Sequence, residues 1–186
     1  MKRIYETERL ILKVLDESYA ESVMQFYIKN KDFLEPFEHT KSKTFYTLEN
    51  HKLTLRLEEE AFLKMNMVRF WLFKKEDTQF ERPIGSLALT NIIRGVFKSC
   101  FLGYKMDKDE INKGYMTEAI QAVVKIAFGY MKLHRIEANI MPRNERSIKV
   151  VEKCGFVKEG LARQYLKING IWEDHYHMVI LNEDDV

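Results

Sequence analysis

The stretch from Tyr104 to Thr117 constrains the fold more than any other. A β-type segment over 99–106 ends in a charged turn, and a single glycine, Gly114, precedes an amphipathic helix. Backbone N–H groups at a helix start lack intrahelical partners, and the helix dipole adds roughly half a positive charge there. Gly114 has no Cβ, so a ligand could approach the backbone closely. The pattern predicts a phosphate-binding turn, with an ordinary strand-to-helix connection as the plainer alternative.

Two common nucleotide-binding motifs are missing from the chain. The sequence contains no G-x-x-x-x-G-K-[ST] run, and no G-x-G-x-x-G follows the first expected strand. Their absence disfavours proteins that bind a mononucleotide or a dinucleotide through those motifs.

Composition predicts one folded domain over residues 1–186, because 46% of the residues are apolar and 12% are aromatic. The 30 basic and 28 acidic residues leave a net charge of only +2, which disfavours a dedicated nucleic-acid or membrane surface. The chain opens with charged residues and has no uncharged apolar run near the ~20 residues that a bilayer requires. We therefore expect a cytoplasmic protein.

The two cysteines, Cys100 and Cys154, stand in apolar surroundings without a C-x-x-C spacing or a nearby set of histidines. We expect reduced core thiols, and neither a disulfide nor a metal site.

The expected elements alternate between strands and helices along the whole chain. Apolar runs predict strands over 7–14, 68–74, 84–92, 99–106, 135–141, 156–168 and 171–181. Helical spacing predicts helices from Asp16 or Ser18 to about Lys31, over about 44–64, after Gly114 to about 131, and from an Asn144 cap to Gly155. Residues 32–39 contain Pro36 and read as an irregular loop, and Asn169-Gly170 predicts a hairpin turn.

Several motifs accompany this order of elements. They are Thr7-Glu8-Arg9-Leu10, 33–38, Arg94-Gly95-x-Phe97, Leu102-Gly103-Tyr104, Lys113-Gly114-Tyr115-Met116-x-Glu118-Ala119, Leu133-His134-Arg135-Ile136, Pro142-x-Asn144-x-x-Ser147 and Gly155-Phe156-x-x-Glu159-Gly160. Together they resemble the GNAT N-acetyltransferase superfamily, and within it the RimJ/RimL type that acetylates the N-termini of ribosomal proteins. The resemblance covers nearly the whole chain, and the hairpin over 165–175 is similar to the alanine-specific branch in particular.

The resemblance implies a mixed α/β (α+β) GNAT fold. Its sheet would have seven strands, mostly antiparallel, with splayed central strands and about four helices. It also implies that acetyl-CoA is the cosubstrate and that no metal takes part.

The acetyl-CoA loop of the family, Q/R-x-x-G-x-G/A, falls on residues 111–116. Ile111 and Met116 depart from the usual residue types, and we expect them to tune affinity because backbone amides bind the phosphates. Lys113 would either assist with its charge or be a plain turn residue. The cofactor-binding residues implied are Tyr104, Lys105, Met106, Asn112, Lys113, Gly114, Tyr115, Met116, Thr117, Asn144, Ser147 and Lys153.

The pantothenyl arm would pair with main-chain groups of 104–106, as an added strand would, and a main-chain N–H near Met106 could hold the developing oxyanion. Asn144 and Ser147 are the catalytic candidates that the resemblance implies. Asn144 would contact the cofactor, and Ser147 would protonate or hydrogen-bond the departing thiolate.

The general base is left open. The glutamate that serves serine-specific relatives falls on Leu166 here, and a base acting through water could be Glu38, Asn139 with a water, or Asp174. His134, His175 and His177 show no metal spacing and are expected to pack or to hydrogen-bond.

The acceptor implied is the N-terminal amine of a ribosomal protein that begins with Ala or Ser, bound near Glu35, Phe37 and Glu38. Two alternatives stay open: a small amine such as a polyamine, an amino sugar or a drug, and a non-catalytic acyl-CoA-binding domain. The exposed edge of the last hairpin could also support a homodimer.

Overall fold

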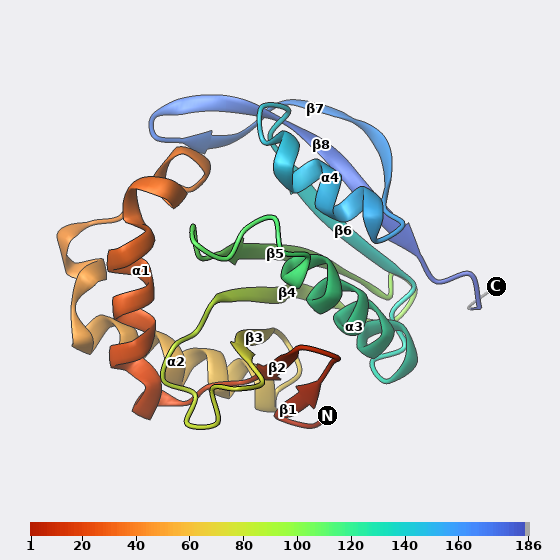
Figure 1. The fold of residues 1–186 in the computed structure, drawn as a ribbon. Coiled ribbons are helices and arrows are strands. Elements are labelled where there is room, and N and C mark those ends of the chain that lie inside the picture. The colour runs from red at the N-terminus through yellow and green to blue at the C-terminus, as the bar shows by residue number, and fades with distance from the viewer. Residues whose placement is uncertain (185–186) are drawn as a thin grey trace.

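The computed structural model describes residues 1–184. One helix pair precedes the middle of the sheet, and two further helices alternate with its later strands (Figure 1). The elements are β1 (Ile4–Glu6), β2 (Leu10–Lys13), α1 (Ala20–Leu34), α2 (Leu48–Leu63), β3 (Val68–Lys74), β4 (Gly85–Ile93), β5 (Ser99–Met106), α3 (Tyr115–Gly129), β6 (Arg135–Ile140), α4 (Glu145–Lys153), β7 (Val157–Ile168) and β8 (Ile171–Leu181).

The strands form a single eight-stranded sheet in the order β1-β2-β3-β4-β5-β6-β8-β7. Among the strands of residues 1–184, only β5 and β6 run parallel, and all other neighbours are antiparallel. The mixed, mostly antiparallel fold class is thus confirmed, but the expected count of seven strands was one too low. Residues 7–9 of the expected first strand form a turn, so that strand is reduced to β2, and the additional strand β1 lies before the expected range and is too short to show an apolar run.

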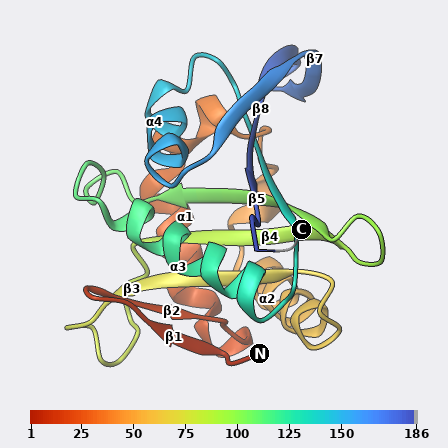
Figure 2. The same cartoon turned by 90° about the vertical axis from the view of Figure 1, so that its right-hand side faces the viewer.

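The helices cover both faces of this sheet. Figure 2 shows α3 in front of β3, β4 and β5, with α1 and α2 behind them. The apolar face of α3 packs on the sheet through Ala119, Ile120, Val123 and Ala127, which are buried in the larger core. A second core lies on the other face, where α1 and α2 enclose Trp71 and Phe73. Burial of these side chains on both faces accounts for the strands that read as continuous apolar runs.

The parallel pair β5 and β6 separates soon after it begins. Three residues of β5, 99–101, pair with residues 135–137 of β6, and the strands then diverge (Figure 1). β5 continues to pair with β4 as far as Met106. The main-chain groups of β5 that face β6 beyond residue 101 therefore have no strand partner, which opens the sheet at its middle.

The first helix is longer than expected. It runs to Leu34 and continues as a 3-10 turn over Glu35–Phe37, so the expected irregular loop is wrong for residues 32–37. Pro36 stands in the first turn of that 3-10 segment, where the missing N–H costs no hydrogen bond.

Both cysteines are free thiols. Burial raises the pKa of Cys154 to about 11 and that of Cys100 to about 12, so neither forms a reactive thiolate near neutral pH. Within residues 1–184, no helix has the length and apolar character that crossing a membrane needs.

Candidate active site

The turn before α3 has the backbone geometry of an anion cradle. Gly114 is the N-cap of α3 and adopts φ = 80°, and Asn112 also lies in the left-handed region at 61°. A Cβ at position 114 would lie 3.3 Å from Nη2 of Arg9. Glycine is required here for its backbone conformation and for this close approach.

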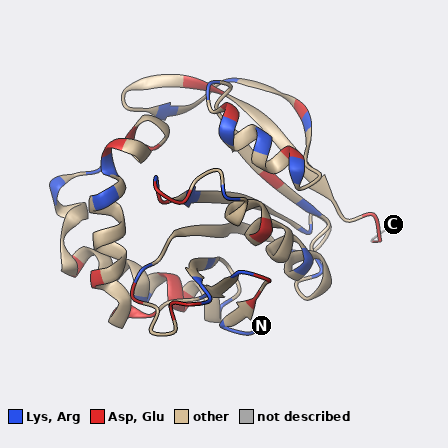
Figure 3. Cartoon of the chain, viewed as in Figure 1, with Lys and Arg blue, Asp and Glu red and all other residues tan. Residues whose placement is uncertain are grey.

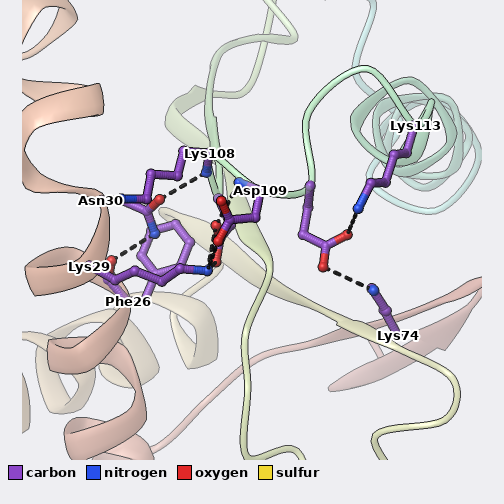
Figure 4. Close-up of polar contacts among 9 residues, drawn as sticks. Phe26, Lys29, Asn30, Lys74, Lys108, Asp109 and Lys113 are labelled. Atoms are coloured by element: carbon purple, nitrogen blue, oxygen red, sulfur yellow. Dashed lines mark hydrogen bonds and ion pairs between the residues drawn. The ribbon is translucent and has the colours of Figure 1, made fainter.

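The first residues of this turn, 107 and 108, are held by side chains of α1 (Figure 4). Lys29 Nζ lies 2.6 Å from an Asp107 carboxylate oxygen, and Asn30 Oδ1 accepts a hydrogen bond from the backbone N–H of Lys108 at 2.8 Å. Asp107 and Asn30 are buried. These contacts preorganise the chain that follows β5.

A buried carboxylate fixes the rest of the turn. Glu110 makes ion pairs of 2.9 Å with Lys74 of β3 and with Lys113 (Figure 4). Burial would raise the pKa of Glu110, but its bonds to Lys113 and Lys74 outweigh burial and lower that pKa. Lys113 is therefore engaged by a carboxylate, and its side chain does not line the cleft described below.

Arg9 braces the turn from the β1–β2 connection. Its Nη1 donates to the carbonyl of Lys113 at 2.9 Å, and its Nε pairs with Glu118 at 2.7 Å. Thr7 also donates to Glu118 at 2.6 Å, and the Arg9 guanidinium stacks 4.7 Å from the Tyr115 ring. The motif over residues 7–10 thus supports the first turn of α3.

The separated strands and the start of α3 line one cleft of about 1000 Å³. It contains all but one of the expected cofactor-binding residues, the exception being Lys113. The members are Tyr104, Lys105, Met106, Asn112, Gly114, Tyr115, Met116, Thr117, Asn144, Ser147 and Lys153.

Asn144 and Ser147 lie together at the start of α4. Asn144 Oδ1 accepts from the backbone N–H of Ser147 at 3.3 Å, which is the N-cap bond expected for an asparagine at this position. Ser147 in turn meets a tyrosine from β5, since its Oγ lies 2.6 Å from Tyr104 Oη.

The tyrosine hydroxyl was not predicted from the sequence, where only the main chain at Tyr104 was expected to matter. Its Oη donates to the carbonyl of Ser147 at 2.9 Å. Burial raises the pKa of Tyr104 well above its ordinary value, and the bond to Ser147 only partly opposes this. Two protonated hydroxyls therefore stand side by side in the cleft, and such a pair can donate to a sulfur or oxygen that gains negative charge.

Basic side chains on α4 follow the same cleft. Arg146, Lys149 and Lys153 recur at helical spacing and line it together. The Lys and Arg positions of α4 are the blue bands on that helix in Figure 3. Only Lys153 was expected, although the spacing of three and four residues could have shown the other two. In all, the cleft is lined by six basic residues against three acidic ones, namely Arg69, Lys105, Arg143, Arg146, Lys149 and Lys153 against Glu38, Glu110 and Glu145.

On the side of α1, the cleft holds a partly buried ion cluster. Glu38 pairs with Lys105 and, at 3.4 Å, with Lys41. Burial would raise the pKa of Glu38, but the charges of Lys105 and Lys41 lower it below its ordinary value. The Lys105 ammonium also lies 4.9 Å from the Tyr27 ring. Glu38 is thus neutralised by the chain itself.

Of the other expected acceptor-binding residues, Phe37 lines the cleft and Glu35 does not. Arg143 stacks 5.4 Å from the Phe37 ring, donates to the Pro36 carbonyl at 2.7 Å and pairs with Glu173 at 2.9 Å. This arginine links the start of α4 to α1 and to the last hairpin.

The turn of the last hairpin closes over this side. Asn169 donates from Nδ2 to the Glu35 carbonyl at 2.8 Å and accepts from Thr40 at 2.7 Å. Glu35 therefore contacts the hairpin turn through its main chain, and it does not line the cleft.

The candidates for a general base differ in their surroundings. Leu166 lines the cleft where no carboxylate stands. Asp174 accepts from the backbone N–H of Gln164 at 2.8 Å, which stabilises a bulge in β7. Asn139 lines the cleft and donates to Tyr165 Oη at 3.3 Å, while its own Oδ1 is buried without a hydrogen bond among the described residues.

The histidines were expected to pack or to hydrogen-bond, and they divide into two kinds. His177 pairs with Glu137 at 2.6 Å, whereas His175 lines the cleft. No cluster of metal-ligating side chains exists among residues 1–184.

The sequence matches the acetyltransferase (GNAT) domain family over residues 9–157. The chain belongs to this family, and it is an acetyltransferase of the GNAT type. Among curated relatives, it is 42% identical to the probable N-acetyltransferase YjcK of Bacillus subtilis, over 95% of this chain and 96% of that protein.

Two solved structures share the fold. The ribosomal-protein-S5-alanine acetyltransferase of Vibrio fischeri aligns over the full length of both chains, with a TM-score of 0.92 and 33% identity. RimJ of Mycobacterium smegmatis, solved in complex with CoA-disulfide, aligns over 97% of this chain and 88% of its own, with a TM-score of 0.89 and 23% identity. The RimJ/RimL resemblance is thereby confirmed.

Proposed function

We propose that the protein transfers the acetyl group of acetyl-CoA to the N-terminal α-amine of a protein in the cytoplasm. The acceptor would be a ribosomal protein that begins with Ala or Ser, and attack would be direct, within a ternary complex. The observation that carries this proposal is the cleft, which joins a helix N-terminus, separated strands and a hydroxyl pair.

Each part of acetyl-CoA has a fitting partner in this cleft. The diphosphate would bind the main chain of 112–117 at the start of α3, and the further phosphate would meet the basic face of α4. The amide groups of the pantothenyl arm would pair with the main chain of 104–106, which β6 leaves free. The thioester would then lie beside the hydroxyls of Tyr104 and Ser147.

Those two hydroxyls would receive the negative charge of the departing thiolate. Ser147 alone is a weak acid, but Tyr104 lies within hydrogen-bond distance of its Oγ and shares the donor role. Asn144 fixes the serine backbone through its N-cap bond. Proton donation of this kind contributes typically 10²–10⁴-fold to a rate.

The charge of the acceptor side favours an α-amine over a polyamine. Glu38 is already paired with two lysines, and Arg69 is paired with Glu58, so this group of side chains carries more positive than negative charge. A polycation would be repelled here, whereas a single amine would lose its proton more readily. An α-amine of pKa ~8 needs about 1.4 kcal/mol for deprotonation at pH 7, against roughly 4.6 for a lysine at ~10.4.

A panel of acceptors tests the proposal. Acetyl transfer from acetyl-CoA is measured by thiol release and mass spectrometry. Peptides that start with Ala or Ser are compared with a peptide whose only amine is a lysine, with spermidine and with an amino sugar. Acetylation of the first group at least tenfold faster supports the proposal. Preference for spermidine or the sugar would select the small-amine alternative, and CoA binding without any transfer would select the non-catalytic one.

The natural acceptor is then identified in cells. Mass spectrometry of ribosomal-protein N-termini, with and without the gene, should show one or more termini that lose their acetyl group. Unchanged termini would rule out a ribosomal acceptor while leaving the peptide activity intact.

A further inference from the structure

His175 occupies the acceptor side of the cleft. It lies on β8 and is 3% exposed, and it lines the cleft together with Asn139 of β6. Asn139 pairs with His177 across the two strands, and His175 is two residues from His177, so the three side chains project from one face of the sheet. Residues 138 and 140 of β6 project from the opposite face into the larger core.

The proton on the His175 ring can be placed from its one hydrogen bond. Nδ1 lies 3.0 Å from the carbonyl oxygen of Glu173. A carbonyl oxygen only accepts, so Nδ1 carries the proton and Nε2 of the neutral ring keeps a lone pair. Nε2 has no hydrogen-bond partner among the described residues, and it is not among the unpaired polar atoms that are fully shielded from solvent.

The surroundings favour the neutral ring. Burial lowers the pKa of His175 below its ordinary value, assisted by His177, while Glu173 and Asp174 on the same strand oppose this. From the neighbouring strand β7, the Tyr165 ring lies 5.5 Å away. A neutral imidazole with a free Nε2 can accept a proton at neutral pH.

We propose that His175 is the general base of the acetyl transfer, accepting the proton of the attacking amine on Nε2 directly or through one water. This inference rests on the proposed function. The other titratable candidates are engaged, because Glu38 is paired with two lysines and Asp174 holds the backbone of β7.

The step balances as follows. The lone pair of the neutral amine forms a C–N bond to the thioester carbonyl carbon, whose π electrons move onto oxygen. Nε2 takes one amine proton and becomes imidazolium. The carbonyl reforms as the C–S bond breaks, and the thiolate takes a proton from the Tyr104–Ser147 pair. Water carries the imidazolium proton back to that pair, which leaves an amide and CoA thiol.

The test compares His175→Gln with His177→Gln. The second is a matched control, because His177 lies on the same strand and the same face but does not line the cleft. For His175→Gln we expect kcat/KM to fall about 100-fold with an Ala-starting peptide, while the Kd for acetyl-CoA stays within twofold. For His177→Gln we expect less than a threefold change in both quantities.

The pH profile separates a base from a structural residue. Both the amine and His175 must lose a proton, so log kcat/KM of the unmodified enzyme should rise with a slope of two at pH values below the pKa of His175, which burial lowers from its ordinary value. His175→Gln should show a slope of one over the same range, and His177→Gln should keep the slope of two. A slope of one in the unmodified enzyme would overturn the proposal.

Two further results would overturn it. One is a His175→Gln enzyme whose kcat/KM stays within threefold of the unmodified enzyme, or whose Kd for acetyl-CoA rises by the same factor as its kcat/KM falls. The other is a ring tautomer with the proton on Nε2, read by ¹⁵N NMR on the unmodified protein, which does not depend on how the variants fold. Failure of the proposed function would appear differently, because the unmodified enzyme would then prefer small amines to peptides. The ratio of kcat/KM between the unmodified enzyme and His175→Gln could still be measured with such an amine.

Discussion

The two sides of the cleft are built in different ways. The cofactor side is built largely on the consecutive residues 104–117, with the start and the basic face of α4 beside them. Contacts from Lys29 to Asp107, from Arg9 to the Lys113 carbonyl and between Glu110 and Lys113 hold that segment. The acceptor side is assembled from side chains of α1, β5, β6 and β8, such as Glu38 with Lys105 and Arg143 with Glu173. The first side presents main chain to a ligand of fixed structure, and the second presents side chains whose identities select an amine.

Loss of the Tyr104 hydroxyl should have the largest effect, because it acts where the two sides meet. For Tyr104→Phe we expect kcat to fall about 100-fold with the Kd for acetyl-CoA unchanged, measured by steady-state kinetics and calorimetry. Tyr130→Phe, at an exposed tyrosine near the end of α3, is the control. Ser147→Ala should lower kcat much less in the Tyr104→Phe enzyme than in the unmodified enzyme, because the two hydroxyls act together. If the two losses in kcat were additive, the hydroxyls would have separate roles.

Gly114→Val should damage the cofactor side alone. A β-branched residue at φ = 80° is strained by about 1–3 kcal/mol, and its Cβ approaches Arg9 at 3.3 Å. We expect the Kd for acetyl-CoA to rise roughly 30-fold by calorimetry. Gly129→Ala, where a Cβ meets nothing within 4 Å, should bind normally. Normal binding by Gly114→Val would show that the turn does not hold the diphosphate.

Glu110→Gln should weaken the support of the turn in a pH-dependent way. We expect a loss of about 1–2 kcal/mol in unfolding free energy near pH 7, less than a fully buried pair would lose because both lysines reach solvent. The pKa of Glu110 is lowered by folding, so its contribution is present above the unfolded pKa of ~4.5 and lost as pH falls through the folded pKa. Denaturant unfolding should show a smaller difference in unfolding free energy between the unmodified protein and Glu110→Gln at pH 4 than at pH 7. A larger difference at pH 4 would contradict this role of Glu110.

Asn169→Gly should have the smallest effect and touch the acceptor side only. Glycine keeps the left-handed backbone at φ = 50° and removes both side-chain bonds to Glu35 and Thr40. We expect about 1 kcal/mol less unfolding free energy and an altered KM for the peptide, with acetyl-CoA affinity unchanged. A change in acetyl-CoA affinity would mean that the two sides are coupled through the hairpin.

The same contrast explains what the sequence could predict. The turn at 104–117, the apolar stripe of α3 and the Asn169-Gly170 hairpin are local patterns, and the structure has a hairpin and a helix at those places. The stop expected at Lys31 was wrong because α1 runs on to Leu34 and continues into a 3-10 turn that accepts Pro36. Local spacing could not show that Glu38 pairs with Lys105, 67 residues away, or that Tyr104 meets Ser147.

His175 shows the same limit. On the chain it is one histidine in a strand, and packing was a reasonable expectation for it. Its importance depends on which face of β8 it projects from and on the Glu173 carbonyl that fixes its tautomer. The face follows from strand register and the carbonyl contact from the local conformation of β8, and a single sequence leaves both open.

The contact of Asn169 with Glu35 and Thr40 has a consequence for turnover. Its two neutral hydrogen bonds contribute about 0.5–1.5 kcal/mol each, so they open more readily than the charged contacts of Arg143 with Glu173 and with the Pro36 carbonyl, which tie the same hairpin to the same segment. We therefore expect the tip of the hairpin, and not its base, to move when a chain-like acceptor enters or leaves. The rate at which one acceptor replaces another should then depend on this contact.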